Sequence, residues 1–130
     1  MITGLYTGIL GLMLVVLILR VAMRRLKYKV GLGDGGIGDL TQAMRVHGNF
    51  IETVPIMLIM MVLMEESLVS TWILHAFGSG IIATRLLHAY GITRSAGHSF
   101  GRKTGIMLSL LLLTVGSVIL ITKALGNIIT

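Results

Sequence analysis

The chain has 130 residues, of which 55% are hydrophobic and 12% are charged, whereas a soluble domain is roughly 45–50% apolar and about 25% charged. This composition excludes an ordinary soluble domain and predicts one all-α membrane domain over residues 1–130. The net charge is +6, but the basic residues gather at the ends of apolar segments with few aromatic neighbours, so no nucleic-acid partner is expected. The absence of cysteine excludes disulfides, a thiol nucleophile and thiolate metal ligands, and no metal site is expected.

The first apolar segment predicts a helix over about residues 3–27, since a helix that crosses a bilayer needs about 20 mostly apolar residues. It lacks the basic start and the cleavage site of a signal peptide, so we expect it to remain in the membrane. Its end is basic, with Arg24, Arg25, Lys27 and Lys29. Repeated glycine at residues 31–38 then breaks the helix, and Asp39 is predicted to be the N-cap of the next one.

Three further helices are predicted over about residues 40–64, 69–90 and 102–125. We expect Pro55 to kink the second of these. In the third, Trp72 is predicted to lie at the outer interface, while Gly78 and Gly80 allow a neighbouring helix to approach closely. The sequence therefore predicts an integral membrane bundle of four transmembrane helices. Because spans this short enclose little space, a homo-oligomer is the expected way to build a sizeable site.

Basic residues in the connections predict the orientation, because retained Lys and Arg mark the cytoplasmic side of a membrane protein. The first and third connections and their flanks carry Arg24, Arg25, Lys27, Lys29, Arg94, Arg102 and Lys103, and the second connection carries no basic residue. We therefore expect a multi-pass protein of the cell inner membrane. Both termini are predicted to lie outside, with any site at the inner helix ends facing the cytoplasm.

A polar face in the first half of the second helix is the most informative feature of the sequence. Arg45, Asn49 and Glu52 are spaced i, i+4, i+7, which stacks them on one side of a helix. Ionisable groups near the bilayer centre cost at least about 2.5–3.5 kcal/mol each, so they usually face partners or a water-filled cavity. A guanidinium, an amide and a carboxylate on one face therefore indicate a polar site.

Two explanations of Glu52 remain open. Its carboxylate can lock the bundle by pairing with Arg20 or Arg85 on a neighbouring helix. Alternatively, the site binds an anionic ligand, because the arginines at the inner helix ends outnumber the acidic residues Glu52 and Asp39. These arginines are Arg20, Arg24, Arg25, Arg45, Arg85 and Arg102. His88, one turn after Arg85, and Tyr90 are further candidates to line such a site.

These features resemble the MAPEG family, the membrane-associated proteins of eicosanoid and glutathione metabolism. The resemblance is carried by four short spans, the basic end of the first helix, the RxHGNxxExxP stretch from Arg45 to Pro55 and an arginine-rich connection before the fourth helix. The small bacterial branch is the most similar, through Gly33-Asp-Gly-Gly36 ahead of that stretch. The resemblance covers essentially the whole chain and implies a homotrimer in which glutathione, the cosubstrate, lies at the inner side between subunits.

The resemblance also implies roles for individual residues. Arg45, Asn49 and Glu52 would hold the carboxylates and the amino group of glutathione. Arg102 would be catalytic, because a cation beside a thiol favours the thiolate and so activates the nucleophile. With the candidates already named, the predicted binding residues are Arg24, Arg25, Arg45, His47, Asn49, Glu52, Arg85, His88 and Tyr90.

The implied function is a glutathione-dependent membrane transferase or peroxidase that acts on an apolar small molecule reaching the site from the membrane lipids. Thr53 and Leu86 stand where characterised eukaryotic members usually have tyrosine, which favours a second hypothesis, a non-catalytic membrane protein that binds a lipid or an anionic small molecule. A remote third hypothesis is a small multidrug exporter, which also has four spans and one membrane glutamate. Arginines beside Glu52 argue against it, because they would keep the carboxylate ionised and prevent proton exchange.

Overall fold

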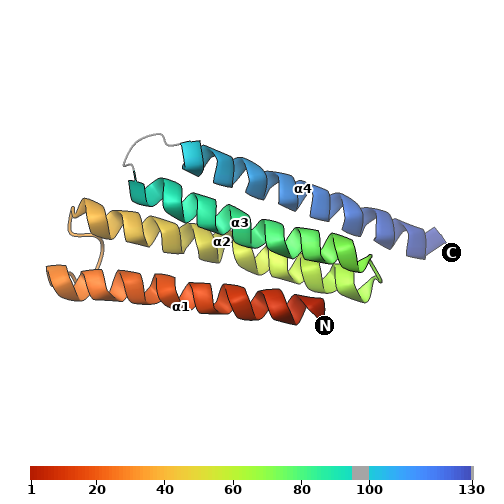
Figure 1. Ribbon diagram of the computed structural model, residues 1–130, viewed down its shortest axis with the longest axis horizontal. Helices are drawn as coiled ribbons and strands as arrows, with labels where there is room; N and C mark the ends of the chain where they lie inside the picture. The colour runs from red at the N-terminus through yellow and green to blue at the C-terminus, as the bar shows by residue number, and fades with distance from the viewer. Residues whose placement is uncertain (95–99, 130) are drawn as a thin grey trace.

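A computed structural model describes residues 1–94 and 100–129, which form an all-α bundle (Figure 1). The helices are α1 (Ile2–Tyr28), α2 (Gly38–Glu66), α3 (Thr71–Arg94) and α4 (Phe100–Ile129). Among the described residues, α2 and α3 contact each other and also α4 and α1, whereas α1 and α4 share no contact. The bundle therefore has α2 and α3 at its centre and the predicted all-α class is confirmed.

Several helix boundaries differ from the predicted ones. The third helix continues past Tyr90 to Arg94, and α4 begins at Phe100 rather than at Arg102. The described residues of the loop expected from residue 91 to 101 are therefore helical. The predicted N-cap is also wrong. Ile37 is the N-cap of α2, and Asp39 lies within the first turn, where its carboxylate accepts hydrogen bonds from α1 instead of from its own helix.

Three of the described helical segments are long and apolar enough to cross a membrane: Ile2–Tyr28, Gly38–Glu66 and Lys103–Gly126. The fourth helix of the bundle, α3, has 24 residues, but its described residues contain no equally apolar stretch of membrane length, because His75, Arg85 and His88 interrupt it. Its polar residues are placed inside the bundle, since Arg85 and His88 are buried. The exposed surface carries many large apolar side chains, as a chain embedded in lipid requires.

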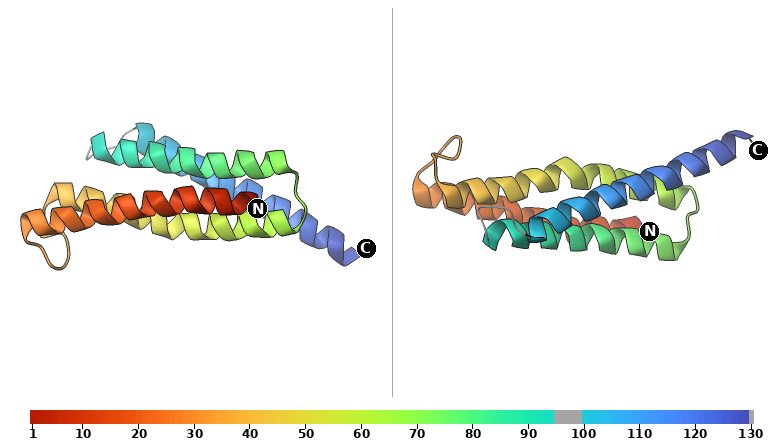
Figure 2. Two further views of the ribbon diagram at one scale, coloured as in Figure 1. Left: turned by 60° about the horizontal axis from the view of Figure 1, so that its bottom comes forward. Right: turned by 90° about the horizontal axis from the view of Figure 1, so that it is seen from above.

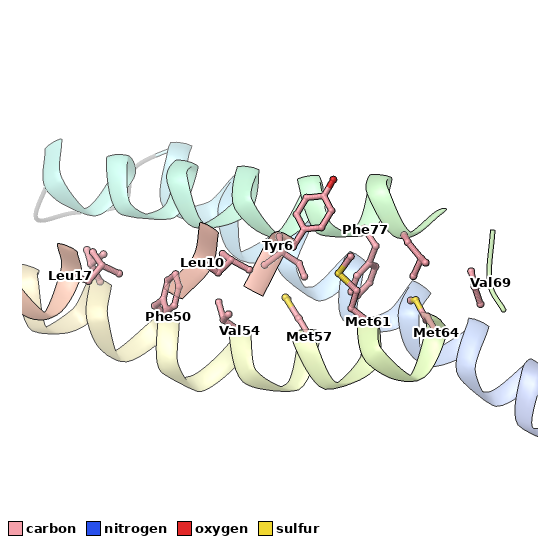
Figure 3. Close-up of a cluster of buried hydrophobic side chains, with 13 residues drawn as sticks. Tyr6, Leu10, Leu17, Phe50, Val54, Met57, Met61, Met64, Val69 and Phe77 are labelled. Atoms are coloured by element: carbon pink, nitrogen blue, oxygen red, sulfur yellow. The ribbon is translucent and has the colours of Figure 1, made fainter. Parts of the chain in front are cut away.

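The buried apolar side chains form one cluster along the bundle axis (Figure 3). Methionines of α2 make up much of it, with Met57, Met61 and Met64 fully buried, and the unbranched Met side chain suits such irregular gaps. Small residues bring α3 close to its neighbours: a Cβ on Gly78 would lie 2.5 Å from the ring of Tyr6, and one on Gly80 would lie 3.1 Å from Leu112. The close helix contacts predicted at both glycines are confirmed.

Polar contacts tie together the end of the bundle that holds the N-terminus. The Glu65 carboxylate accepts hydrogen bonds from the backbone N–H groups of Ile2 (2.6 Å) and Thr3 (2.9 Å), so α2 caps the first turn of α1. The Tyr6 hydroxyl lies 2.9 Å from Nδ1 of His75 and 3.1 Å from Oγ of Ser79. These contacts place His75 in a structural role between α1 and α3.

Figure 2 shows that the loop from α1 to α2, the end of α3 and the start of α4 lie at the opposite end of the bundle from the N-terminus. In the first loop, Gly33, Gly35 and Gly36 have positive φ angles between 58° and 72°, which glycine adopts at little cost. Helix α2 runs through Pro55 as one continuous helix. The polar first half of α2 follows directly after the loop of residues 29–37, which we call the glycine loop.

Candidate functional site

A cleft of about 990 Å³ opens beside the first half of α2, and ligand sites are usually about 300–1,000 Å³. The α2 helix supplies most of its wall, the glycine loop forms one end, and one residue each comes from α3 and α4. The lining residues are Asp34, Gly36, Gly38, Thr41, Gln42, Met44, Arg45, Gly48, Asn49, Glu52, His88 and Ile106. The polar face predicted from the i, i+4, i+7 spacing therefore lines one cleft.

Arg45 and Glu52 are exposed, and neither makes a hydrogen bond or an ion pair within the part of the chain that the structure describes. The first explanation of Glu52, an ion pair with Arg20 or Arg85, is therefore wrong for those residues. The two charged groups also cannot pair with each other easily, because seven residues of helix separate them by roughly 10 Å. Among the described residues, the cleft thus presents one free cation, Arg45, and one free anion, Glu52, two turns apart.

Arg85 is buried next to this cleft, with 3% of its surface exposed. Its Nη1 donates hydrogen bonds to Oδ1 of Asn49 (2.6 Å) and to Oγ1 of Thr53 (2.7 Å), and its Nε donates to Oγ1 of Thr84 (3.3 Å). Its Nη2 donates to Oγ of Ser109 on α4. Every one of these acceptors is neutral, so α2, α3 and α4 surround this guanidinium with dipoles in place of a carboxylate.

Asn49 joins the Arg85 cluster to the cleft. Its backbone oxygen accepts from the Thr53 hydroxyl (2.7 Å), and its side-chain oxygen accepts from Arg85. Asn49 also lines both the cleft and a cavity of about 70 Å³ beside Arg85 and Ser109. Sequence reasoning missed Thr53 and Ser109 as partners of Arg85. Hydroxyl residues inside otherwise apolar helices were the available signal, since such groups need a partner in a membrane protein.

The basic end of α1 is mostly occupied by structural contacts. Arg24 donates from Nε to Oδ1 of Asp39 at 2.9 Å, and the same carboxylate accepts from the Tyr28 hydroxyl at 3.1 Å. Arg25 donates to the backbone oxygen of Gly31 at 3.2 Å. Neither arginine lines the cleft. In the isolated chain these two cations hold the first loop and the start of α2 against α1.

The glycine loop contributes Asp34, which the sequence had not marked as a site residue. Its Oδ1 accepts from the backbone N–H of Gly36 (3.0 Å) and its Oδ2 from the Thr41 hydroxyl (2.8 Å). These hydrogen bonds, with the Gly36 bond first, lower the pKa of Asp34 because they favour the ionised carboxylate. An aspartate between glycines, followed by a threonine at the start of a helix, is the sequence signal for these two hydrogen bonds, which stabilise the loop.

The remaining predicted residues fall in three places. His88 lies in the cleft wall and is 4% exposed, whereas His47 and Tyr90 do not line the cleft. Arg102 lies in the first turn of α4, but its side chain, like residue His98, is outside the described part of the structure. Among the described residues, no group of three His, Asp or Glu side chains is arranged to hold a metal ion.

Comparison with known proteins identifies one matching family and two similar proteins. The model of the MAPEG family matches residues 3–122. Inner membrane protein YecN of Escherichia coli strain K12 is 38% identical over 91 residues, which cover 70% of this chain and 70% of YecN. The protein of the same name from Escherichia coli O6:H1 matches with the same identity and coverage.

Proposed function

We propose a glutathione-dependent activity on the premise that the chain belongs to the MAPEG family of membrane proteins. In this proposal the chain is a membrane transferase or peroxidase that joins glutathione to an apolar electrophile, or uses it to reduce one. The free cation and free anion in the cleft are the observation that carries the proposal. A ligand that satisfies both must itself carry both charges.

Glutathione fits this requirement by its chemistry. It is a tripeptide with two carboxylates and one ammonium group, and an extended tripeptide is roughly 10 Å long, the same length that separates Arg45 from Glu52 along α2. Arg45 would take a carboxylate in a bidentate contact, and Glu52 would take the ammonium group. The amide of Asn49 lies between them on the same face and can donate to a carboxylate or a peptide oxygen.

The thiol would react as the thiolate. A neighbouring cation lowers the free energy of the charged form, and Arg102 in the first turn of α4 is the residue proposed for this role. Attack of the sulfur on an electrophilic carbon would form the S–C bond while a leaving group departs with the electron pair. In the peroxidase reaction, two thiols would be oxidised to a disulfide while the hydroperoxide is reduced to an alcohol and water.

The second substrate would enter from the bilayer. Ile106 of α4 gives the cleft an apolar wall, and Leu110 and Leu113 continue this side into the small cavity beside Arg85. The open side of the cleft, where Arg45 and Glu52 are exposed, is where a neighbouring subunit of a homotrimer would close the site. The proposed orientation places this end of the bundle on the cytoplasmic side, with both termini outside.

Binding is the first test of this function. Full-length protein in detergent is titrated with glutathione by calorimetry, and the ultraviolet absorbance of the thiolate is followed in parallel. We expect saturable binding that Arg45→Gln and Glu52→Gln each weaken at least tenfold. Lys123→Gln is the matched control, because Lys123 is an exposed cation far from the cleft on α4. Arg102→Ala is expected to retain binding and lose the thiolate signal.

A non-catalytic protein that binds a lipid or an anionic small molecule is the second candidate. Thr53 favours it, because its hydroxyl is engaged by Arg85 and by the backbone oxygen of Asn49. That hydroxyl cannot donate to a ligand sulfur. Binding of glutathione without any thiolate signal in the wild-type chain would support this candidate, and no binding at millimolar glutathione would refute the glutathione proposal.

A further inference from the structure

We propose that Arg85 is a positioning residue: it fixes the side-chain amide of Asn49 so that the amide N–H groups are presented to the cleft. The cleft is taken as a ligand site, and to that extent the inference rests on the proposed function. Arg85 itself does not line the cleft. It would therefore influence a ligand only through Asn49.

The chemistry of the contact determines which way the amide faces. A guanidinium has five N–H donors and no acceptor, so the atom of Asn49 that lies 2.6 Å from Nη1 of Arg85 must be the oxygen. The amide nitrogen of Asn49 makes no hydrogen bond within the described residues. A rotated amide would set its own donors against those of Arg85. The contact thus leaves Asn49 able to offer the cleft donors, and Arg45, one turn earlier, adds more donors on the same face.

The guanidinium is held firmly enough to act as such an anchor. It contacts hydroxyl groups on three helices, and each of these hydroxyls is itself oriented by a backbone oxygen. Thr53 donates to Asn49 (2.7 Å), Thr84 to Ile81 (2.8 Å) and Ser109 to Gly105 (2.6 Å). The hydroxyl protons are therefore committed, which leaves their oxygens to accept from Arg85.

Helix packing adds a second restraint on Arg85. A Cβ added at Gly105 would lie 3.0 Å from the backbone nitrogen of His88. Helices α3 and α4 therefore approach each other closely within one turn of both Arg85 and Ser109. With the amide of Asn49 held in this way, the cleft selects an anionic or carbonyl group at Asn49 and rejects an ammonium group there.

Selective labelling tests the proposal directly, because the chain has only two asparagines, Asn49 and Asn127. In an NMR spectrum, protein labelled with ¹⁵N-asparagine in detergent micelles gives two pairs of side-chain NH₂ signals. The pair that disappears in Asn127→Asp belongs to Asn127, and the other pair belongs to Asn49. In the wild-type chain we expect the NH₂ group of Asn49 to be as rigid as an ordered backbone amide, with an order parameter of about 0.85. In Arg85→Gln it is expected to fall below about 0.6, while the Asn127 pair stays unchanged.

Controls separate positioning from a general structural role. Ser109→Ala removes one neighbour of Arg85 and keeps the bond to Asn49, so the Asn49 pair is expected to stay ordered. If Arg85 is merely structural, Arg85→Gln lowers the thermal midpoint but leaves the Asn49 pair ordered, which overturns the proposal. If Arg85→Gln does not fold, the wild-type chain and Ser109→Ala still test the proposal. A mobile Asn49 amide in either of these two proteins would refute it.

The same spectra keep this inference distinct from the proposed function. Added glutathione is expected to shift the Asn49 pair and not the Asn127 pair. An ordered Asn49 pair that glutathione does not shift would count against glutathione as the ligand and leave the positioning by Arg85 intact. A shifted pair that is equally ordered with and without Arg85 would support the ligand and refute the positioning.

Discussion

Gly78→Ala tests the closest approach between α1 and α3. The new Cβ would lie 2.5 Å from Cγ and Cδ2 of Tyr6 and 2.6 Å from Cδ1, whereas carbon atoms pack best at about 3.5–4.0 Å. The ring would have to retreat by about 1 Å. It cannot do so freely, because its hydroxyl is held by His75 at 2.9 Å and by Ser79 at 3.1 Å. Figure 3 shows the ring of Tyr6 pointing from α1 toward α3.

The magnitude follows from three terms. Overpacking a well-packed core costs about 1–3 kcal/mol, and a hydrogen bond lost at Tyr6 costs about 0.5–1.5 kcal/mol. Alanine in a helix interior returns about 0.5–1 kcal/mol relative to glycine. We therefore expect Gly78→Ala to lower the free energy of unfolding by about 2 kcal/mol, within a range of about 0.5–4 kcal/mol.

Unfolding by a denaturing detergent in mixed micelles, followed by circular dichroism, measures this change. Gly11→Ala is the matched control, because no atom lies within 4 Å of the Cβ that it adds to α1. It is expected to be neutral or to stabilise slightly. In a Tyr6→Ala background the penalty of Gly78→Ala is expected to disappear. Equal effects of Gly78→Ala and Gly11→Ala would refute the packing argument.

Three further predictions concern single side chains. Asn49→Asp is expected to keep or raise the thermal midpoint, because a carboxylate accepts from a guanidinium more strongly than an amide oxygen, and to weaken glutathione binding; a lowered midpoint would contradict this. Hydrogen bonds lower the pKa of Asp34 in the folded chain, so its ionised carboxylate stabilises the loop. This stabilisation is complete above the pKa that Asp34 has in the unfolded chain, and it is lost as the pH falls through the lower pKa that Asp34 has in the folded chain. Amide exchange of the loop is therefore expected to rise in acid, and Asp34→Asn, whose exchange is expected to change little over the same acid range, is the control. Glu65→Ala is expected to speed amide exchange in the first turn of α1, whereas the exposed neighbour in Glu66→Ala is expected to have no effect; equal effects would refute the cap.

Much of the bundle is predictable from the sequence because apolar length, glycine and helical spacing are local signals. The i, i+4, i+7 spacing of Arg45, Asn49 and Glu52 predicts a shared face, and all three line the cleft. Gly78 and Gly80 likewise predict close contact, and both are confirmed. Each of these inferences needs only the geometry of one helix.

Partner choice was not predictable in the same way. The sequence suggests Glu52 as the partner of Arg85, since opposite charges attract, yet Arg85 binds Asn49, Thr53 and Ser109 instead. Which helices meet at Arg85 depends on tertiary packing, and neutral hydroxyls give no charge signal in a sequence. The role of Asp39 was unpredictable for the same reason. Aspartate is a common N-cap residue, but here its carboxylate accepts a hydrogen bond from Arg24 on another helix.

The charges around the first half of α2 explain why we propose the cleft as the place for a ligand. Arg24 is neutralised by Asp39, and Arg85 is surrounded by neutral acceptors. In the described cleft wall, Arg45 and Glu52 are thus left free, on one face and too far apart along α2 to neutralise each other. A singly charged ion could satisfy only one of them. A zwitterionic molecule of roughly 10 Å could satisfy both, and for this reason we place a peptide-like ligand ahead of a simple anion or a lipid headgroup.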